Sequence, residues 1–227
     1  MSKLSIIVPV LGEGENIAAM LDGLADLRSL GVEVIVVDGG SRDATVRRAR
    51  LRADCVISAP RSRALQMNAG AARAGGDVLL FLHADTHLPH DADHVVLNGL
   101  QRSGRAWGRF DVRIDGRHPL LRLVAWLMRV RSRMTGIATG DQAIFVRREA
   151  FHAVGGYPAI PLMEDIALSR ELKRVSRPLC LRESVVTSGR RWEKNGILRT
   201  IFLMWTLRLA FFFGADAKAL AHRYGYE

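Results

Sequence analysis

The sequence predicts an α/β fold whose first half is built on a parallel sheet. Short apolar, β-branched runs alternate with segments of helical periodicity between residues 4 and 90. Glycines and glycine pairs stand where these runs end or begin. Polar residues follow several of the expected strands directly, at the carboxyl ends where ligands bind in sheets of this kind.

The first half of the chain alternates strands and helices in strict order. Four apolar runs indicate buried strands, over residues 4–10, 32–38, 55–59 and 78–83. Helical spacing or a capping residue predicts the helices between them, over residues 17–30, 41–52 and 63–74. Within this set, Gly31 ends the first helix and Ser41 is expected to cap the second.

The second half is less regular, and the sequence predicts a mixed arrangement there. Alternating or apolar runs indicate strands over residues 106–115, 142–148 and 179–188. Amphipathic spacing indicates helices over residues 119–134 and 163–175. An apolar and basic helical tail begins at Ile197.

The chain is strongly basic, with 33 Lys and Arg residues against 23 Asp and Glu and a net charge of +10. This balance favours an anionic partner such as a phosphorylated small molecule, an acidic membrane surface or nucleic acid. Surplus charge that serves only solubility is the alternative. The sequence lacks the interleaved aromatic residues that form a stacking platform for RNA, so we expect no nucleic-acid partner.

The two cysteines, Cys55 and Cys180, stand in unrelated contexts, and no CxxC pattern occurs. This excludes a disulfide framework and the usual zinc motifs, and it favours a reducing, cytoplasmic setting. The first residues run directly into a strand pattern and do not resemble a signal peptide. No apolar stretch is long enough to span a membrane, and the nearest one, residues 201–214, is interrupted by Arg208.

The end of the second expected strand carries residues suited to a phosphate group. Asp38 leaves the strand, and Gly39 and Gly40 permit a tight turn and a close approach of a ligand. Backbone N–H groups near Ser41 then open a helix, which favours an anion. The alternative is an ordinary capped turn with Asp38 in solvent.

The end of the fourth strand carries residues suited to a metal. Asp85 offers the carboxylate oxygens that a hard divalent cation prefers, and phosphates and water can supply the remaining ligands. His83 shares one face of an extended chain with Asp85 and could join it at a metal site. The alternative is a half-buried histidine that has its own protein partner.

Five motifs in order resemble glycosyltransferase family 2, and together they span about residues 4 to 192. They cover residues 4–17, 36–45, 63–86, 140–158 and 163–172. The chain is similar to a compact bacterial group of this family whose metal motif reads His-Ala-Asp, the radical-SAM and selenodomain-associated type. Each motif alone is weak, but five in order with sensible spacing are specific.

The resemblance implies a GT-A fold, a nucleoside diphosphate sugar as donor, and a divalent cation, Mn²⁺ or Mg²⁺, that bridges the diphosphate. It implies one glycosyltransferase domain over residues 1–227, in which 1–90 bind the nucleotide sugar and 91–196 form the acceptor and catalytic half. Residues 197–227 form the tail. The implied acceptor is a hydroxyl group, on a small molecule or a lipid-linked one.

The resemblance also implies which residues hold the donor. Pro9 and Glu13 match positions that line the nucleotide pocket, and Asp38 matches the residue that contacts the base. Arg63 and Asn68 lie in the segment that helps to hold the nucleotide.

The remaining site residues follow from the same resemblance. Asp85 matches the metal-binding aspartate, and Asp165 matches the general base. Glu164 stands beside Asp165 in the substrate site, and on a helix the two side chains point about 100° apart, so only one can serve as base. Arg191 and Trp192 resemble an Arg-Trp motif near the acceptor and the diphosphate. Transfer opposite the leaving group inverts the anomeric centre and needs a single base.

Three positions depart from the family pattern. Gly39 stands where the family often has a second acid, and His83 replaces the first aspartate of the metal motif. Ser188 stands where processive members carry glutamine, three residues before Arg-Trp. The last departure, together with the modest length, argues against a processive polysaccharide synthase.

The tail and the function each leave alternatives open. The tail, from Ile197, is too apolar for a free helix and could lie on an anionic membrane, at the inner face, or pack on the core or on a second copy of the chain. A nucleotidyltransferase of similar fold would want basic residues in the loop at Glu13, which has none. A non-catalytic, basic membrane-surface or nucleic-acid-binding protein would have no need of the three aspartates Asp38, Asp85 and Asp165.

Overall fold

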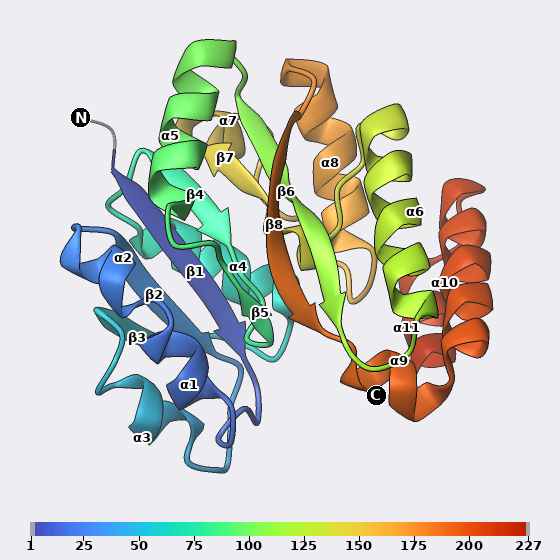
Figure 1. Cartoon of the computed structure of the whole chain (residues 1–227), viewed down its shortest axis with the longest axis horizontal. Coiled ribbons are helices and arrows are strands. Elements are labelled where there is room, and N and C mark those ends of the chain that lie inside the picture. The colour runs from blue at the N-terminus through green and yellow to red at the C-terminus, as the bar shows by residue number, and fades with distance from the viewer. Residues whose placement is uncertain (1–2, 226–227) are drawn as a thin grey trace.

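The structure, a computed structural model, describes residues 3–225 apart from the side chain of Arg191. Within this part of the chain the strands form one eight-stranded sheet in the order β3-β2-β1-β4-β7-β6-β8-β5 (Figure 1). Its strands are β1 (Leu4–Val10), β2 (Glu33–Asp38), β3 (Cys55–Ser58), β4 (Val78–Phe81), β5 (Thr86–His87), β6 (Trp107–Asp115), β7 (Phe145–Arg147) and β8 (Leu179–Ser188).

The first half of the sheet is parallel, as the sequence predicts. β1 pairs in parallel with β2 on one side and β4 on the other, and β3 extends the sheet beyond β2. β4 ends at Phe81, earlier than predicted, because its ladder with β1 stops at the pair Ile7–Phe81. The chain then leaves the sheet and carries residues 83–85 into a loop.

The second half of the sheet is mixed, which confirms the predicted α/β class with a less regular second half. β7 runs antiparallel to both β4 and β6, whereas β8 runs parallel to β6. The short strand β5 pairs antiparallel with β8 and closes this edge. The loop after β4 is therefore tied to the last long strand of the chain.

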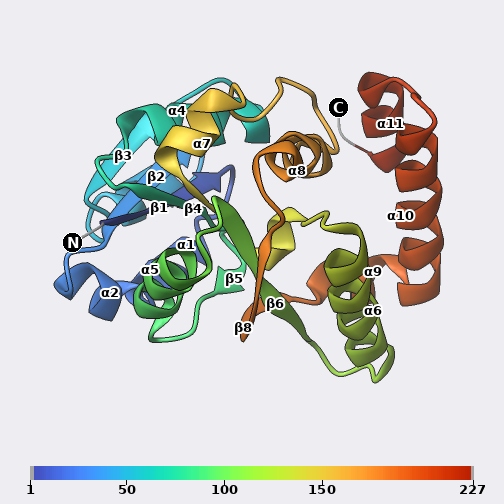
Figure 2. The same cartoon turned by 90° about the horizontal axis from the view of Figure 1, so that it is seen from above.

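Helices cover both faces of the sheet (Figure 2). Successive strand residues point to opposite faces, so each apolar run supplies two cores. Ile7, Ile35 and Leu79 pack under α4, α7 and α8, and their neighbours in the strands pack under α1, α2, α5 and α6. The helices are α1 (Ile17–Asp22), α2 (Ala25–Ser29), α3 (Thr45–Ala49), α4 (Arg63–Arg73), α5 (Ala92–Ser103), α6 (Leu120–Thr135), α7 (Arg148–Ala153), α8 (Glu164–Val175), α9 (Arg190–Asn195), α10 (Ile197–Phe212) and α11 (Ala217–Tyr224).

Two predicted helices of the first half differ in the structure. The expected helix over 17–30 is broken into α1 and α2 at Gly23, where the lack of a side chain weakens a helix interior. Ser41 does not cap a helix. Its N–H donates to the carboxylate of Asp38, and its hydroxyl accepts from the N–H of Gly12, so Ser41 joins two loops while α3 begins only at Thr45.

The predicted strand over 142–148 is shortened to β7 by a 3₁₀ turn, Gly140–Gln142. Thr139 and Gln142 close this turn with a reciprocal capping box, which draws the backbone away from the sheet. Helices α5 and α7 were not predicted from the sequence, because their apolar positions are few and lie between stronger patterns.

A buried ion-pair network fixes α6 against β6. The guanidinium of Arg109 is fully buried and donates to the carboxylate of Asp111 and to Ser132 Oγ on α6. Arg133, also on α6, donates to the other oxygen of Asp111 at 2.6 Å. Because a buried charge without a partner is costly, this network holds α6 in one position over the sheet.

The C-terminal helices form a separate small core. Leu207 of α10 and Leu220 of α11 pack against Ile166 of α8. The other side of α10 exposes a run of large apolar residues, which are Leu198, Phe202, Trp205, Leu209 and Phe212. One of the predicted alternatives, packing on the core, therefore accounts for only one side of the tail. None of the helices in residues 3–225 is long and apolar enough to cross a membrane.

Candidate active site

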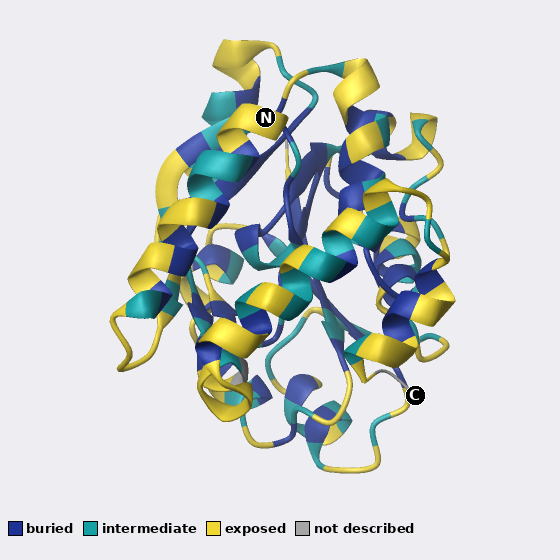
Figure 3. Cartoon of the chain, turned by 90° about the vertical axis from the view of Figure 1, so that its right-hand side faces the viewer, coloured by how far each residue is buried: buried dark blue, intermediate teal, exposed yellow. Residues whose placement is uncertain are grey.

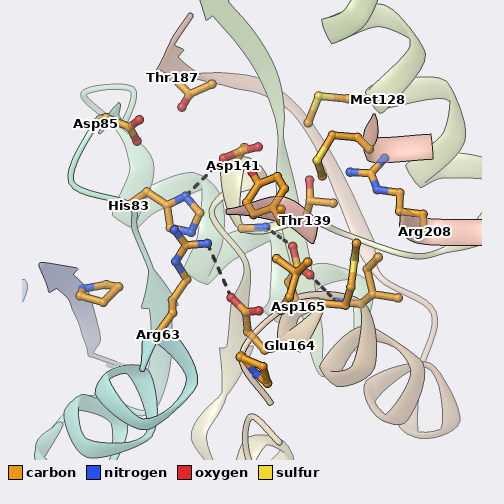
Figure 4. A pocket seen from close by; sticks show the side chains of 18 of the residues that line it. Arg63, His83, Asp85, Met128, Thr139, Asp141, Glu164, Asp165, Thr187 and Arg208 are labelled. Atoms are coloured by element: carbon orange, nitrogen blue, oxygen red, sulfur yellow. Dashed lines mark hydrogen bonds and ion pairs between the residues drawn. The ribbon is translucent and has the colours of Figure 1, made fainter. Parts of the chain in front are cut away.

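The two halves of the sheet and the C-terminal helices enclose a cavity of about 1020 Å³ (Figure 4). The carboxyl ends of β1 and β4 form one wall, and α6 and α10 form the opposite one, with the beginnings of α4 and α8 between them. Ligands bind at such strand ends in open α/β sheets. The predicted site residues that line the cavity are Pro9, Glu13, Arg63, His83, Asp85, Glu164, Asp165 and Trp192.

Asp85 lies in the loop after β4, and β8 fixes the position of this loop. The N–H of Ser188 donates to the carbonyl oxygen of Asp85 at 3.1 Å, and Thr86 Oγ1 donates to Thr187 Oγ1 at 3.0 Å. Among the described residues, the carboxylate of Asp85 receives only a long hydrogen bond of 3.4 Å, from Thr86 Oγ1. Its remaining lone pairs are therefore available to a ligand in the cavity.

His83 lies against the 3₁₀ turn. Its Nδ1 atom lies 3.3 Å from Asp141 Oδ1, and a Cβ atom at Gly140 would collide with its Nε2 atom. Burial raises the pKa of Asp141, but the hydrogen bond with His83 and the charges of His83 and Arg63 lower it, and the net shift is downward. The Nδ1 atom of His83 thus has a protein partner, and the ring edge that carries Nε2 packs against Gly140.

Asp165 lies in the first turn of α8 and points into the cavity (Figure 4). Its carboxylate accepts hydrogen bonds from the N–H of Gly140 at 2.9 Å and from the N–H of the next residue, Ile166, at 2.7 Å. Met163, just before the helix, has φ of 67°, an uncommon conformation for a residue other than glycine. This turn of the backbone directs the start of α8 towards the cavity, and the two hydrogen bonds leave lone pairs of Asp165 free for a substrate proton.

Glu164 is buried next to Asp165, and Arg63 of α4 lies 3.7 Å from its Oε1 atom. Burial and the nearby charge of Asp165 raise the pKa of Glu164, and Arg63 only partly opposes this. Glu164 therefore links α4 to α8 across the cavity (Figure 4).

Three predicted residues are used differently or are not described. Asp38 is buried outside the cavity wall, and its carboxylate accepts the N–H groups of Gly40 and Ser41. Asn68 also lies outside the wall, where its side-chain amide forms two hydrogen bonds with the backbone of Tyr157. Arg191 belongs to α9, but its side chain lies outside the described part of the structure. Their predicted contacts with substrate stay predictions.

Two arginines that the sequence analysis did not assign also line the cavity, Arg131 of α6 and Arg208 of α10. Burial is the main cause that lowers the pKa of both guanidinium groups, and the positive charge of Arg208 helps to bring that of Arg131 to about 10. Arg208 could have been found from the sequence, since it interrupts an apolar run. Arg131 stands in a basic segment that gives no such signal.

The residues of this cavity fit a divalent cation held mainly by substrate. Within the described residues, no group of three or more His, Cys, Asp and Glu side chains is arranged to hold a metal. The carboxylate of Asp85, which accepts only one long hydrogen bond from the described residues, faces a cavity large enough for a diphosphate. Mg²⁺ and similar ions are commonly held by one or two carboxylates with phosphates and water as the other ligands.

Comparison with solved structures confirms the predicted GT-A type of fold. Similar structures include S. aureus TarS 1–349 in complex with UDP-GlcNAc, with a TM-score of 0.66, 17% identity, and coverage of 82% of this chain and 58% of that one. Another is the mannosyltransferase PcManGT from Pyrobaculum calidifontis with GDP-Man and Mn²⁺, with a TM-score of 0.66, 20% identity, and coverage of 92% and 61%. At such identities the likeness shows the fold, and the chain spans less than two thirds of each of these two proteins.

A third similar structure is glucosyl-3-phosphoglycerate synthase from Mycobacterium tuberculosis with Mn²⁺, UDP and phosphoglyceric acid, with a TM-score of 0.59, 18% identity, and coverage of 82% and 69%. No curated protein sequence matches the chain. Residues 5–155 match the family described as Glycosyl transferase family 2, which is more than half of the chain.

The contact between His83 and Gly140 gives a first prediction. Gly140→Ala should lower the free energy of unfolding by about 1–3 kcal/mol, because the added methyl group overpacks against the histidine ring. Chemical denaturation measures this. Gly75→Ala is the control, since a Cβ there would meet only Glu33 at 3.7 Å.

A double variant separates this contact from other effects of the substitution. In a His83→Ala background, Gly140→Ala should cost much less, because the ring is gone. An equal cost in both backgrounds would show that the ring does not fix the turn.

Proposed function

The chain belongs to glycosyl transferase family 2, and we propose that it transfers a sugar from a nucleoside diphosphate sugar to an acceptor hydroxyl with inversion. The observation that carries the proposal is that Asp85 and Asp165 face one cavity from opposite sides of the 3₁₀ turn (Figure 4). One aspartate is suited to the leaving diphosphate and the other to the attacking hydroxyl. The single sheet that passes through both halves supports one domain over residues 1–227.

The donor is proposed to bind at the carboxyl ends of the parallel strands. Pro9 and Glu13 follow β1 in the cavity wall, and Arg63 offers a positive charge at the start of α4. Asp38 is proposed to meet the base from the neighbouring strand end. Similar structures hold UDP-GlcNAc, GDP-Man or UDP, which supports a nucleotide sugar as donor without selecting a base or a sugar.

Asp85 is proposed to hold the divalent cation, because its carboxylate is fixed by β8 and has free lone pairs. When bound, such a cation neutralises charge on the diphosphate as it leaves. Two of the similar structures contain Mn²⁺, which supports Mn²⁺ over Mg²⁺. His83 is left out of the proposed metal site because its Nδ1 atom contacts Asp141 and its ring packs against Gly140. It instead orients Asp141 and the 3₁₀ turn.

Asp165 is proposed to take the proton of the acceptor hydroxyl as the hydroxyl attacks the anomeric carbon. Two backbone N–H groups orient its carboxylate and do not use all of its lone pairs. Glu164 is buried, and its raised pKa and its contact with Arg63 suit a structural link better than a role as base. Trp192, and Arg191 beside it in α9, are proposed to lie near the acceptor and the diphosphate.

The tail is proposed to place the site at an anionic membrane surface. The exposed apolar residues of α10 lie beside α6, where Trp126 is also exposed, and Arg122 and Arg199 are exposed on the same two helices. Figure 3 views this side of the molecule and shows exposed segments along the helices that face the viewer. An apolar face with basic neighbours binds anionic lipid surfaces. The cysteines Cys55 and Cys180 are both unpaired. A reducing compartment at the inner face of a membrane is proposed together with this surface.

The metal assignment predicts that Asp85→Ala abolishes the Mn²⁺-dependent part of nucleoside diphosphate binding while the fold stays intact. The reason is that, within the described residues, no cluster of three or more metal-binding side chains is present to hold the cation without Asp85. Calorimetry with UDP and GDP, with and without Mn²⁺, measures it. Asp91→Ala, an exposed acid in the same region, is the control. Unchanged Mn²⁺-dependent binding in Asp85→Ala would remove this residue from the site.

The base assignment predicts that Asp165→Asn binds donor and metal normally but transfers sugar about 10²–10⁴-fold more slowly. An amide of the same shape cannot take the proton. Glu164→Gln should be milder, because its side chain diverges from that of Asp165. Release of nucleoside diphosphate from the donor, with acceptor or with water as nucleophile, measures both rates. If only Glu164→Gln were inactive, the two acids would exchange roles.

The membrane assignment predicts co-sedimentation with anionic vesicles at low salt and release at high salt, because screening shortens the reach of the basic residues. Phe202→Ser should weaken binding, since this exposed residue belongs to the apolar face. Leu51→Ser, equally exposed but outside that face, is the control. A stable dimer that Phe202→Ser disrupts, with no vesicle binding, would instead assign the face to a second copy of the chain.

A further inference from the structure

The wall of the cavity opposite Asp85 carries two arginines whose buried donors lack acceptors. Nε and Nη2 of Arg131, and Nε of Arg208, are buried and donate to no atom of the described residues. Buried guanidinium donors normally find carboxylates or carbonyls, because an unmade hydrogen bond from a charged group is costly. Something outside the described protein atoms is needed to satisfy them.

The two arginines come from different elements and meet in one place. Arg131 lies on α6 and Arg208 on α10, both line the cavity, and the positive charge of Arg208 contributes to the lowered pKa of Arg131. Asp165 and Asp141 lie near enough to stabilise the charge of Arg208, but neither forms an ion pair or hydrogen bond with it among the described residues. Two guanidinium groups therefore line the cavity with buried donors that no described protein atom accepts.

The position of these arginines is on the acceptor side of the site. Figure 4 shows Asp85 and Arg208 at opposite sides of the cavity, with Asp141 and Asp165 between them. The proposed metal and diphosphate lie at Asp85, so a molecule that contacts Arg208 lies beyond the base. The order across the cavity is donor, base, arginines.

We propose that Arg131 and Arg208 bind a phosphate group of the acceptor, on the same molecule whose hydroxyl group faces Asp165. Two guanidinium groups match a phosphate monoester, whose second charge a carboxylate lacks, and their planar donors suit its oxygens. The inference rests on the proposed glycosyl transfer and adds the chemical class of the acceptor. Arg131 and Arg208 are positioning residues for the hydroxyl that attacks.

The surroundings of the arginines suit an acceptor that also has an apolar part. Val124, Met128, Ile201, Met204 and Trp205 line the same wall. Several of these residues belong to the faces of α6 and α10 that lead to the exposed apolar surface. A lipid phosphate would satisfy both features, whereas a water-soluble phosphate would use the arginines alone.

Calorimetry in the presence of a chelator tests the site without donor or metal. Three probes are used. Glycerol phosphate carries the phosphate alone, the matching monoacylglycerol carries the apolar chain alone, and a short-chain lysophosphatidate carries both the phosphate and the chain. Arg131→Gln and Arg208→Gln should each weaken binding of the phosphate probes about tenfold or more, since a charge-assisted hydrogen bond is lost. Arg73→Gln on α4 and Arg102→Gln on α5, exposed and outside both the cavity wall and the apolar face of α6 and α10, are the controls and should bind normally.

The probes distinguish the source of the phosphate. Tighter binding of lysophosphatidate than of glycerol phosphate assigns a lipid acceptor, and equal binding assigns a water-soluble one. Unchanged phosphate binding in both glutamine variants would overturn the proposal. So would an equal loss of Mn²⁺-dependent UDP or GDP affinity, which would place the arginines in the donor site. These binding measurements do not use Asp85→Ala or Asp165→Asn, which test the proposed glycosyl transfer. Failure of the phosphate site can therefore be distinguished from failure of the proposed function.

A second measurement excludes a merely structural role. Arg208→Met keeps the length and the apolar stem but removes the unsatisfied charge, so it should raise the melting temperature while it weakens phosphate binding as Arg208→Gln does. A structural arginine would give the opposite shift, a lower melting temperature. Arg208→Lys should retain part of the phosphate binding, because it keeps the charge and loses the planar donors.

Discussion

The 3₁₀ turn at Gly140–Gln142 is the constraint on which the site depends. His83, from the end of β4, lies against its first residue and contacts Asp141. The N–H of Gly140 donates to Asp165 at the start of α8. The turn thus joins the parallel half of the sheet to the helix that carries the proposed base. Only a glycine at position 140 leaves room for the histidine ring. The presence of His83 in place of the aspartate of the family motif and the presence of Gly140 therefore depend on each other.

The same arrangement explains how the two proposed chemical roles stay separate. Asp85 is held through its backbone by β8, which leaves its carboxylate open, whereas the carboxylate of Asp165 is oriented by two backbone N–H groups. An aspartate that binds a metal benefits from carboxylate oxygens that no protein donor orients. An aspartate that must meet one proton benefits from a fixed direction. The backbone supplies each condition by a different route.

The sequence predicted most of the fold because the parallel half is built from local, periodic signals. β1, β2 and β4 are continuous apolar runs, and their burial on both faces leaves little choice of structure. It could not predict the 3₁₀ turn, whose capping box depends on Thr139 and Gln142 three residues apart in an otherwise strand-like run. It also could not show that Asn68 serves the backbone of Tyr157, since that pair is 89 residues apart in the chain.

Arg131 and Arg208 are unfavourable for stability at their positions, which indicates that they serve the proposed function. A sequence that favoured stability alone would fill this wall with apolar residues, as it does around both arginines. The chain instead satisfies the fully buried Arg109 through Asp111 and Ser132, while it leaves buried donor atoms of the half-buried Arg131 and Arg208 without protein acceptors. The contrast within one helix is informative, because α6 carries both Ser132, which satisfies a buried guanidinium, and Arg131, which is left unsatisfied. The free-energy cost of unsatisfied buried donors is present at Arg131 and Arg208 but absent at Arg109. This difference points to a ligand that supplies the missing acceptors.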